Sequence, residues 1–354
     1  MQLEFWEQQL PFEYPFTISN GRTKTHQHSL MVKLSLGNWV GFGEAPAIVY
    51  YNVTVQGMME QLKKNKKLIE KFALIDPERF WHFLHHLFPN DPFLVCALDM
   101  AGWDLWGQMK KLPLHQLWHT TWNTEASDNH SLPPICDYTL GIDSIEKMVE
   151  KMNAHPWPIY KVKVGTDYDV EMITALRKHT DKPIRVDANA GWSTEEALLK
   201  IPALAALGVE LVEQPLAKDN WEGMAQLKKQ SILPLFADES CVFEKEVTTC
   251  ALYFHGINIK LTKCSGLTPA LRMIKEARTL GLKVMMGSMN ESVIGSAAIA
   301  QFLPQLDYVD MDGPLLMTEL NGVGLDFSFD QQNGKIAPLN KPGLGVRYIA
   351  PFKK

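Results

Sequence analysis

The feature that most constrains this chain is a regular alternation of short apolar runs and helix-like segments over its last two thirds. Eight such runs are separated by longer segments, among them residues 170–179 and 194–207. The runs span residues 136–141, 159–164, 184–188, 209–213, 235–237, 257–261, 283–287 and 308–311. This alternation predicts successive βαβ units and a parallel sheet.

The spacing of the runs narrows the fold. The polar residues that close five successive runs, at positions 163, 187, 213, 238 and 260, lie 22 to 26 residues apart. Eight units of that length fit a closed (β/α)8 barrel of the TIM type. A doubly wound open sheet is the alternative, but it usually carries a G-x-G-x-x-G turn, which this sequence lacks. We therefore predict a barrel over residues 135–320.

The region before the barrel has a different character. Strand-like runs extend to about residue 48, helix-like segments follow to residue 118, and a polar segment that ends in two prolines covers residues 119–134. Such a segment is typical of a connector. We predict an N-terminal domain over residues 1–125, the catalytic barrel over 135–320 and a C-terminal segment over 321–354.

Composition excludes several classes of protein. The net charge of −5 gives no electrostatic footprint for nucleic acid or anionic membranes, so neither is expected as a partner. The five cysteines show no paired spacing, which favours reduced thiols. The N-terminus lacks the basic and then apolar pattern of a signal peptide, and no apolar run is long enough to span a bilayer. We expect a cytoplasmic protein.

Carboxylates close three consecutive runs of the predicted barrel. Asp187, Glu213 and Asp238 end the third, fourth and fifth strands, where TIM barrels carry their catalytic groups. Three converging anions repel one another unless a cation lies among them, and an all-oxygen site suits Mg²⁺. The alternative is that these acids are paired with nearby lysine or arginine side chains. The three in register favour a metal site.

Lysines close two other runs. Lys161 and Lys163 are two residues apart on the second strand, so their side chains share one face. Two neighbouring cations disfavour each other's protonation, which predicts that one acts as a base near neutral pH. Lys260 ends the sixth strand, opposite the second in an eight-stranded barrel. The lysines are expected to flank a ligand from opposite sides. The alternative for any one of them alone is a solvated side chain at a strand end.

This arrangement indicates a reaction type. Removal of a proton next to a carboxylate creates an enediolate that a divalent cation stabilises, with lysine as the base. A second lysine on the far side can return the proton and invert the centre.

Several segments carry a resemblance to a known family. YKVKVG (160–165), VDANAGW (186–192), VEQP (212–215), ADES (237–240), NIKLTKCSG (258–266) and GSMNES (287–292) resemble the muconate lactonizing enzyme subgroup of the enolase superfamily. GFGEAP (41–46) and ALDMAGWDLWG (97–107) resemble that family's capping domain. The resemblance implies a barrel with an α+β capping domain built from the N-terminal region and the C-terminal segment.

One further segment narrows the activity. VDMDGPLL (309–316) resembles the D-x-D motif with which dipeptide epimerases hold the substrate's α-ammonium, here through Asp310 and Asp312 on one strand face. The resemblance implies a dipeptide epimerase of the L-Ala-D/L-Glu type that acts in recycling of cell wall peptides. A muconate cycloisomerase, an o-succinylbenzoate synthase and a non-catalytic metal-stabilised barrel remain as alternatives.

The family resemblance also implies a role for each site residue. Lys163 and Lys260 would exchange the α-proton of the dipeptide's C-terminal residue, and Lys161 would support them. The expected ligands of one Mg²⁺ per subunit are Asp187, Glu213 and Asp238, supported by Asn189 and Glu239. The expected substrate contacts are Thr139 with the carboxylate, Arg22 with the side chain, and Ser288, Met289, Asp310 and Asp312. The oligomeric state, including a homo-oligomer, is left open.

Overall fold

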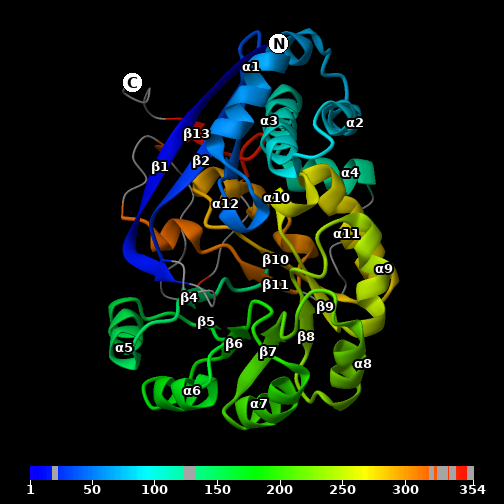
Figure 1. The fold of residues 1–354 in the computed structure, drawn as a ribbon. Helices are drawn as coiled ribbons and strands as arrows, with labels where there is room; N and C mark the ends of the chain where they lie inside the picture. The colour runs from blue at the N-terminus through cyan, green and yellow to red at the C-terminus, as the bar shows by residue number, and fades with distance from the viewer. Residues whose placement is uncertain (18–22, 123–132, 319–322, 325–333, 335–339, 349–354) are drawn as a thin grey trace.

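The computed structural model describes residues 1–17, 23–122, 133–318, 323–324, 334 and 340–348. Within these residues the chain forms a three-stranded antiparallel sheet, an eight-stranded parallel sheet and a short pair of strands, β12 (Val323–Gly324) and β13 (Arg347–Tyr348). In Figure 1 the first sheet and its helices lie above the eight-stranded sheet.

The antiparallel sheet packs against a buried helix. Its strands are β1 (Gln2–Thr17), β2 (Thr23–Leu36) and β3 (Trp39–Pro46), and η1 (Val49–Tyr51) follows. Helices α1 (Val55–Lys71) and α3 (Pro92–Lys110) pack on this sheet, and α2 (Pro77–Leu87) and α4 (Leu114–Trp122) pack against α3. Helix α3 lies so close to β3 that a Cβ atom at Gly43 would be 1.9 Å from the carbonyl oxygen of Ala97. The glycines of the GFG segment permit this approach.

The parallel sheet confirms the predicted barrel. Its strands are β4 (Tyr138–Leu140), β5 (Tyr160–Lys163), β6 (Ile184–Asp187), β7 (Val209–Glu213), β8 (Leu235–Ala237), β9 (Gly256–Ile259), β10 (Lys283–Gly287) and β11 (Tyr308–Asp310). Each strand pairs with the next along the chain. A bridge between Cys136, just before β4, and Val309 of β11 closes the circle.

Helices surround the barrel as the alternation predicted (Figure 1). They are α5 (Ile145–Ala154), α6 (Asp169–Arg177), α7 (Thr194–Ala206), α8 (Trp221–Gln230), α9 (Glu244–Tyr253), α10 (Leu261–Cys264), α11 (Leu267–Thr279) and α12 (Val293–Ala300), with the 3-10 turns η2 (Leu303–Gln305) and η3 (Gly313–Leu316). Local sequence sets their starts: Ser193 and Glu196 form a capping box at the start of α7.

Buried acids of the N-terminal region bond to backbone of the barrel. Glu44 of β3 accepts hydrogen bonds from Ser292 N (2.9 Å) and Ser292 Oγ (2.6 Å) at the start of α12. Asp99 of α3 accepts from Thr268 N (3.0 Å) and Thr268 Oγ1 (2.8 Å) in α11. These contacts fix the N-terminal region over the barrel, although the domain boundaries remain a prediction.

A third buried acid serves the C-terminal part of the chain. Asp104 accepts from Phe42 N at 2.9 Å and from Leu344 N at 2.8 Å. At Leu344 the C-terminal part of the chain therefore contacts the N-terminal region, as predicted.

The long β1–β2 hairpin reaches from the upper sheet down beside β4 and α5 (Figure 1). Near its tip, Tyr14 lies edge-on to His155 with ring centroids 6.1 Å apart. The predicted substrate contact Arg22 lies outside the described residues; in the sequence it directly precedes β2.

Two composition-based expectations can be compared with the structure. All five cysteines are free and buried. None of the helices in the described ranges has the length and apolar character needed to cross a membrane.

Candidate active site

A cavity of about 650 Å³ lies at the carboxyl ends of the barrel strands. The N-terminal region covers it with Thr23, Lys24 and residues 48–51. The predicted site residues that line it are Thr139, Lys163, Asn189, Asp238, Glu239, Lys260, Ser288, Met289, Asp310 and Asp312. The structure therefore brings most of the predicted site together from seven different strand ends.

Lys161 lies at the centre of an ion-pair network and is almost fully buried. Its Nζ is 2.6 Å from Asp310 Oδ2, 2.7 Å from Glu213 Oε2 and 3.3 Å from Asp187 Oδ2. Burial lowers the pKa of Lys161, but these three carboxylates outweigh it and hold the pKa well above the ordinary lysine value. Lys161 is therefore a fixed positive charge beneath the cavity.

Lys163 lies two residues farther along β5 and faces the same acid. Its Nζ is 2.6 Å from Asp187 Oδ2, which confirms that the two lysines share one face of the strand. Burial raises the pKa of Asp187, but Lys163 and Lys161 outweigh that effect and bring the pKa below the usual aspartate value. Asp187 therefore stays ionised.

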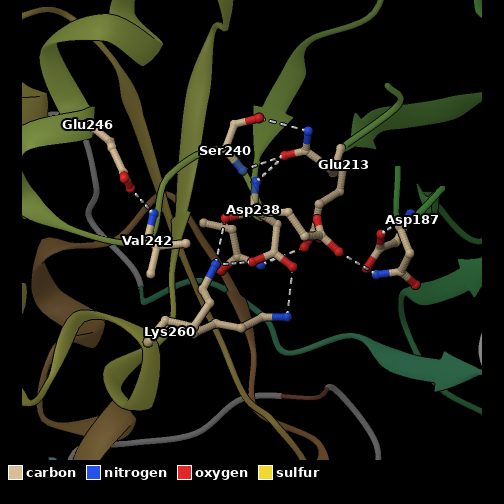
Figure 2. Close-up of polar contacts among 12 residues, drawn as sticks. Asp187, Glu213, Asp238, Ser240, Val242, Glu246 and Lys260 are labelled. Carbon is tan, nitrogen blue, oxygen red and sulfur yellow. Dashed lines mark hydrogen bonds and ion pairs between the residues drawn. The ribbon is translucent and has the colours of Figure 1, made fainter. Parts of the chain in front are cut away.

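Asp238 is held by two lysines that follow β9 (Figure 2). Lys260 Nζ is 2.9 Å from Asp238 Oδ2, and Lys263 Nζ contacts Asp238 Oδ1 and, at 2.6 Å, the Asp238 carbonyl oxygen. Despite its burial, Asp238 has a pKa well below the ordinary value because of these two ammonium groups. The pKa of Lys260 is raised in turn, since the charges of Asp238 and Glu213 outweigh the effect of burial.

Glu213 is the least neutralised of the three predicted metal ligands. Burial and the neighbouring Asp187 raise its pKa, even though Lys161 is in contact with it. Asn258 of β9 donates to Glu213 Oε1 at 2.7 Å.

These contacts bear on the prediction that one of Lys161 and Lys163 acts as a base. Carboxylates surround Lys161 and raise its pKa, so Lys161 does not take that role and Lys163 stays the predicted base. Each of the three predicted metal ligands is paired with a lysine, which is the alternative considered for such acids. Within the described part of the chain, no three acidic, histidine or cysteine side chains are grouped as a ready-made metal cluster.

The donor set nonetheless fits a hard divalent cation. Asp187, Glu213 and Asp238 are buried at adjacent strand ends and offer only oxygen. Two further buried oxygens nearby, Asn189 Oδ1 and Glu239 Oε2, have no hydrogen-bond partner among the described residues. Unsatisfied buried oxygens are costly, and a hydrated cation would supply partners for them.

Asp310 and Asp312 both line the cavity, but they differ from the prediction in two ways. Strand β11 ends at Asp310, and Asp312 precedes the 3-10 turn η3, because Gly313 and Pro314 do not continue the strand. Asp310 is already bonded to Lys161, and its pKa is lowered to about 2, with the lysine outweighing burial.

Asp312 is bonded to the backbone of β4. It accepts from Thr139 N at 2.6 Å, and burial and the charge of Asp310 raise its pKa to about 7. Thr139, predicted to contact a substrate carboxylate, thus orients Asp312 here.

Several residues of the site were not predicted. Asn258 lies two residues before Lys260, so the period of a strand could have indicated its inward position. Lys263 lies in the short helix α10, which begins directly after Lys260, and reaches Asp238 from there. Residues 48–51, which cover the cavity, carry no sequence signal of this role.

Comparison with known proteins agrees with this geometry. Residues 143–350 match the family model described as enolase C-terminal domain-like. The chain is 46% identical over 349 residues to the L-Ala-D/L-amino acid epimerase of Flavobacterium johnsoniae, which covers 99% of this chain and 100% of that protein. It is 35% identical to the L-Ala-D/L-Glu epimerase of Bacteroides thetaiotaomicron, over 99% of this chain and 88% of that protein.

Solved structures give the same result. A dipeptide epimerase from Cytophaga hutchinsonii, complexed with Mg and the dipeptide D-Ala-L-Val, superposes with a TM-score of 0.90 at 25% identity and covers 99% of this chain and 96% of that chain. A substrate complex of the L-Ala-D/L-Glu epimerase from Bacillus subtilis has a TM-score of 0.88 at 28% identity, with 99% of both chains covered. With its barrel, its capping sheet and these relatives, the chain belongs to the enolase superfamily, in the family of the dipeptide epimerases.

Proposed function

We propose that this protein is a Mg²⁺-dependent dipeptide epimerase that moves a proton to and from the α-carbon of a dipeptide's C-terminal residue. The observation that carries the proposal is the presence of Lys163 of β5 and Lys260 after β9 in one cavity with Asp238. Asp187 and Glu213, which end β6 and β7, are buried beneath it in contact with Lys163 and Lys161. Strands β5 and β9 are the second and sixth of the eight, so they lie across the barrel from each other.

In this proposal the substrate lies across the barrel mouth. Asp187, Glu213 and Asp238 would hold one Mg²⁺ per subunit, and the dipeptide's carboxylate would lie at this end of the site. Asp310 and Asp312 would receive the ammonium group at the other end, with Asp312 oriented by Thr139. Ser288 and Met289, at the end of β10, line the same cavity.

The two lysines would act on opposite faces of the α-carbon. One removes the α-proton, the other donates a proton to the opposite face, and the roles exchange with the hand of the substrate. Bound Mg²⁺ stabilises the negative charge that develops on the substrate carboxylate. Lys161, a fixed positive charge beneath the cavity, adds to that stabilisation.

A base must first lose its proton, and the ion pairs described above oppose this for Lys260. As holders of a cation, Asp187 and Asp238 would offer the two lysines less negative charge. Fewer anionic contacts lower a lysine pKa toward the range of a base.

A dipeptide library in D₂O with Mg²⁺ tests the proposal. Deuterium should enter the α-carbon of the C-terminal residue only, and the second diastereomer should accumulate. No deuterium at any α-carbon would contradict an epimerase.

Replacement of Asp310 and Asp312 by asparagine separates this activity from its alternatives. A dipeptide epimerase should lose most turnover in Asp310→Asn and in Asp312→Asn, because an uncharged amide no longer pairs with the ammonium group. A muconate cycloisomerase or an o-succinylbenzoate synthase has no such group to hold and would tolerate both changes. A binding protein would show no turnover to lose and would keep its ligand affinity in Lys163→Ala.

Within this class we propose an L-Ala-D/L-Glu or related dipeptide as substrate, in a cytoplasmic protein that recycles cell wall peptides. The relatives with epimerase names support the substrate class. The library decides the preference: L-Ala-D-Glu should be turned over as well as any other member. A kcat/KM far below that of other dipeptides would contradict the recycling role, and fractionation of the source cells tests the location.

A further inference from the structure

The short helix that follows Lys260 connects this lysine to the N-terminal region. Helix α10 begins directly after Lys260 and packs against α3, beneath which it lies in Figure 1. The backbone carbonyl of Lys260 accepts hydrogen bonds from Lys263 N (3.0 Å) and Cys264 N (3.1 Å). One helical turn thus joins Lys260 to the residues that follow it, so a shift at the end of α10 would reach Lys260.

Helix α10 ends in a backbone conformation that few side chains adopt. Its last turn closes with a bond from Gly266 N to the Leu261 carbonyl oxygen at 2.8 Å. Ser265, between them, has a φ of 73° and a ψ of 27°, in the left-handed region. Residues other than glycine visit this region rarely, and such a conformation persists where the surrounding structure supports it. Contacts made to Ser265 from outside α10 are therefore important for the position of the helix.

Trp81 of α2 makes such a contact. Its indole Nε1 donates to the Ser265 carbonyl oxygen at 2.9 Å and to Ser265 Oγ at 3.3 Å. The tryptophan side chain is buried, and 184 residues separate it from Ser265 in the sequence. A buried hydrogen bond of this kind fixes both partners, because breaking it leaves a donor and an acceptor without water.

The indole ring of Trp81 is itself held in place. The Arg272 guanidinium of α11 lies 4.6 Å from the ring centroid, in the position of a cation–π contact. Arg272 Nε and Nη2 donate to the two carboxylate oxygens of Glu244 at 2.6 and 2.8 Å. The ring of His85 stacks on the indole with centroids 4.8 Å apart. These neighbours orient the indole N–H group toward Ser265.

The two proposed bases differ in their relation to this turn. Lys260 and Lys263, at the two ends of the turn, both bond to Asp238. Lys163 lies on β5 and is bonded to Asp187 instead. The turn that the N-terminal region holds therefore carries one of the two proposed bases and not the other.

Resting on the proposed function, we propose that Trp81 is a positioning residue for Lys260, because its N–H bond to Ser265 holds α10 and with it the lysine in place. The N-terminal region thereby sets the activity of one base, besides covering the substrate cavity. Loss of the bond should slow proton transfer at one face of the α-carbon only, since a misplacement of about 1 Å can cost about 10²-fold in rate.

The test is Trp81→Phe, which keeps an aromatic ring beside Arg272 and removes the N–H donor. The measurement is the initial rate of α-proton loss in D₂O with Mg²⁺, from pure L-Ala-L-Glu and pure L-Ala-D-Glu or from the pair that the library ranks first. Proton loss is measured because the equilibrium constant ties the two directions of net epimerisation together.

The expected result is unequal. The diastereomer whose α-proton Lys260 removes is the one that Lys163→Ala still exchanges. In Trp81→Phe its rate of proton loss should fall about tenfold or more, whereas the rate for the other diastereomer should change less than about twofold. In case phenylalanine prevents folding, 3-benzothienylalanine at position 81 keeps the shape of the indole and lacks only its N–H group.

Trp103→Phe is the matched control. Trp103 is also a buried tryptophan of the N-terminal region, and its Nε1 donates at 2.9 Å to Thr268 Oγ1, a side chain of α11. The variant removes a comparable bond at the same interface but none to Ser265. The two rates of proton loss should therefore keep their wild-type ratio.

Three results would overturn the inference or its basis. Equal slowing for both diastereomers, or no slowing, in a folded position-81 variant overturns the inference while the epimerase stands. The same unequal slowing in Trp103→Phe also overturns it, since any loosening of the interface would then suffice. If the wild-type protein removes no α-proton from any dipeptide, or Lys163→Ala removes none from either diastereomer, the proposed function with its two bases fails and the inference with it.

Discussion

Two groups of buried carboxylates in this molecule have opposite protonation behaviour. Asp187, Asp238 and Asp310 at the barrel mouth face lysine ammonium groups at short distance. Glu44 and Asp99, where the N-terminal region meets the barrel, are bonded to backbone N–H groups and to serine and threonine hydroxyls.

The pKa values of these five acids follow their partners. The first three have lowered pKa values, about 2 for Asp310, because lysine charges outweigh burial, whereas Glu213 and Asp312 at the same mouth have raised pKa values. Burial raises the pKa of Glu44 and brings that of Asp99 to about 7, since neutral donors compensate only in part. Ionised carboxylates at the barrel mouth can therefore bind a metal or a substrate. Where the N-terminal region meets the barrel, the carboxyl groups act as hydrogen-bond acceptors.

The largest expected effect comes from removing one charge at the mouth. Asp238→Asn leaves Lys260 and Lys263 buried without their main anionic partner. Breaking a buried ion pair typically costs about 3–5 kcal/mol, and loss of a metal ligand and of lysine positioning should lower turnover about 10³-fold or more.

Urea unfolding and the D₂O exchange assay measure these two effects. Asp307, paired with Arg278 and Lys283 at the start of β11, offers a control, since Asp307→Asn removes a paired aspartate far from the proposed metal ligands. If Asp238→Asn keeps the wild-type free energy of unfolding and the wild-type rate of α-proton exchange, neither stability nor activity depends on the ion pairs at the barrel mouth.

A smaller effect is expected at the interface. Asp99→Ala removes the acceptor for Thr268 N and Thr268 Oγ1 and should lower the free energy of unfolding by about 1–3 kcal/mol. Asp99→Asn keeps an acceptor oxygen of the same size and should cost less. Equal losses for the two variants in urea unfolding would mean that negative charge, not hydrogen bonding, is what the interface needs.

The smallest effect is a pH dependence of the same residue. The folded-state pKa of Asp99 is about 7, above its ordinary value of 3.8, so protonation favours the folded state. Its contribution is fully present below about pH 4 and is lost as the pH rises through about 7. The free energy of unfolding of wild type relative to Asp99→Asn should therefore fall between pH 5 and pH 7 and then level off.

Urea unfolding of both proteins at pH 5, 6, 7 and 8 checks this sign. A difference that grows with pH would place Asp99 in the same class as the mouth acids. Asp310 should behave in the opposite way, because its lowered pKa gives stability that is lost as the pH falls from about 4 toward 2.

The same comparison explains how much the sequence could predict. The barrel strands and the acids and lysines that end them were predictable, because each strand is a compact apolar run and its last residue marks the mouth. The pairing of Lys161 with Asp310 was not, since 149 residues separate them and either lysine of β5 could have faced β11.

The interface acids were harder still. Glu44 bonds to Ser292, which is 248 residues away, and no charge pattern in the sequence around either residue indicates that they pair. The covering role of Tyr51 depends on how the N-terminal region lies over the barrel mouth. Local periodicity contains no information on that contact.

The central claim is that two lysines serve opposite faces of one α-carbon. The most direct measurement is α-proton exchange in D₂O with Mg²⁺ for Lys163→Ala and Lys260→Ala, each offered both diastereomers of a dipeptide. Both variants should lose epimerisation by about 10²-fold to 10⁴-fold, and each should retain deuterium exchange for one diastereomer, a different one in each variant. Exchange of both diastereomers in either variant, or of the same one in both, would contradict the account.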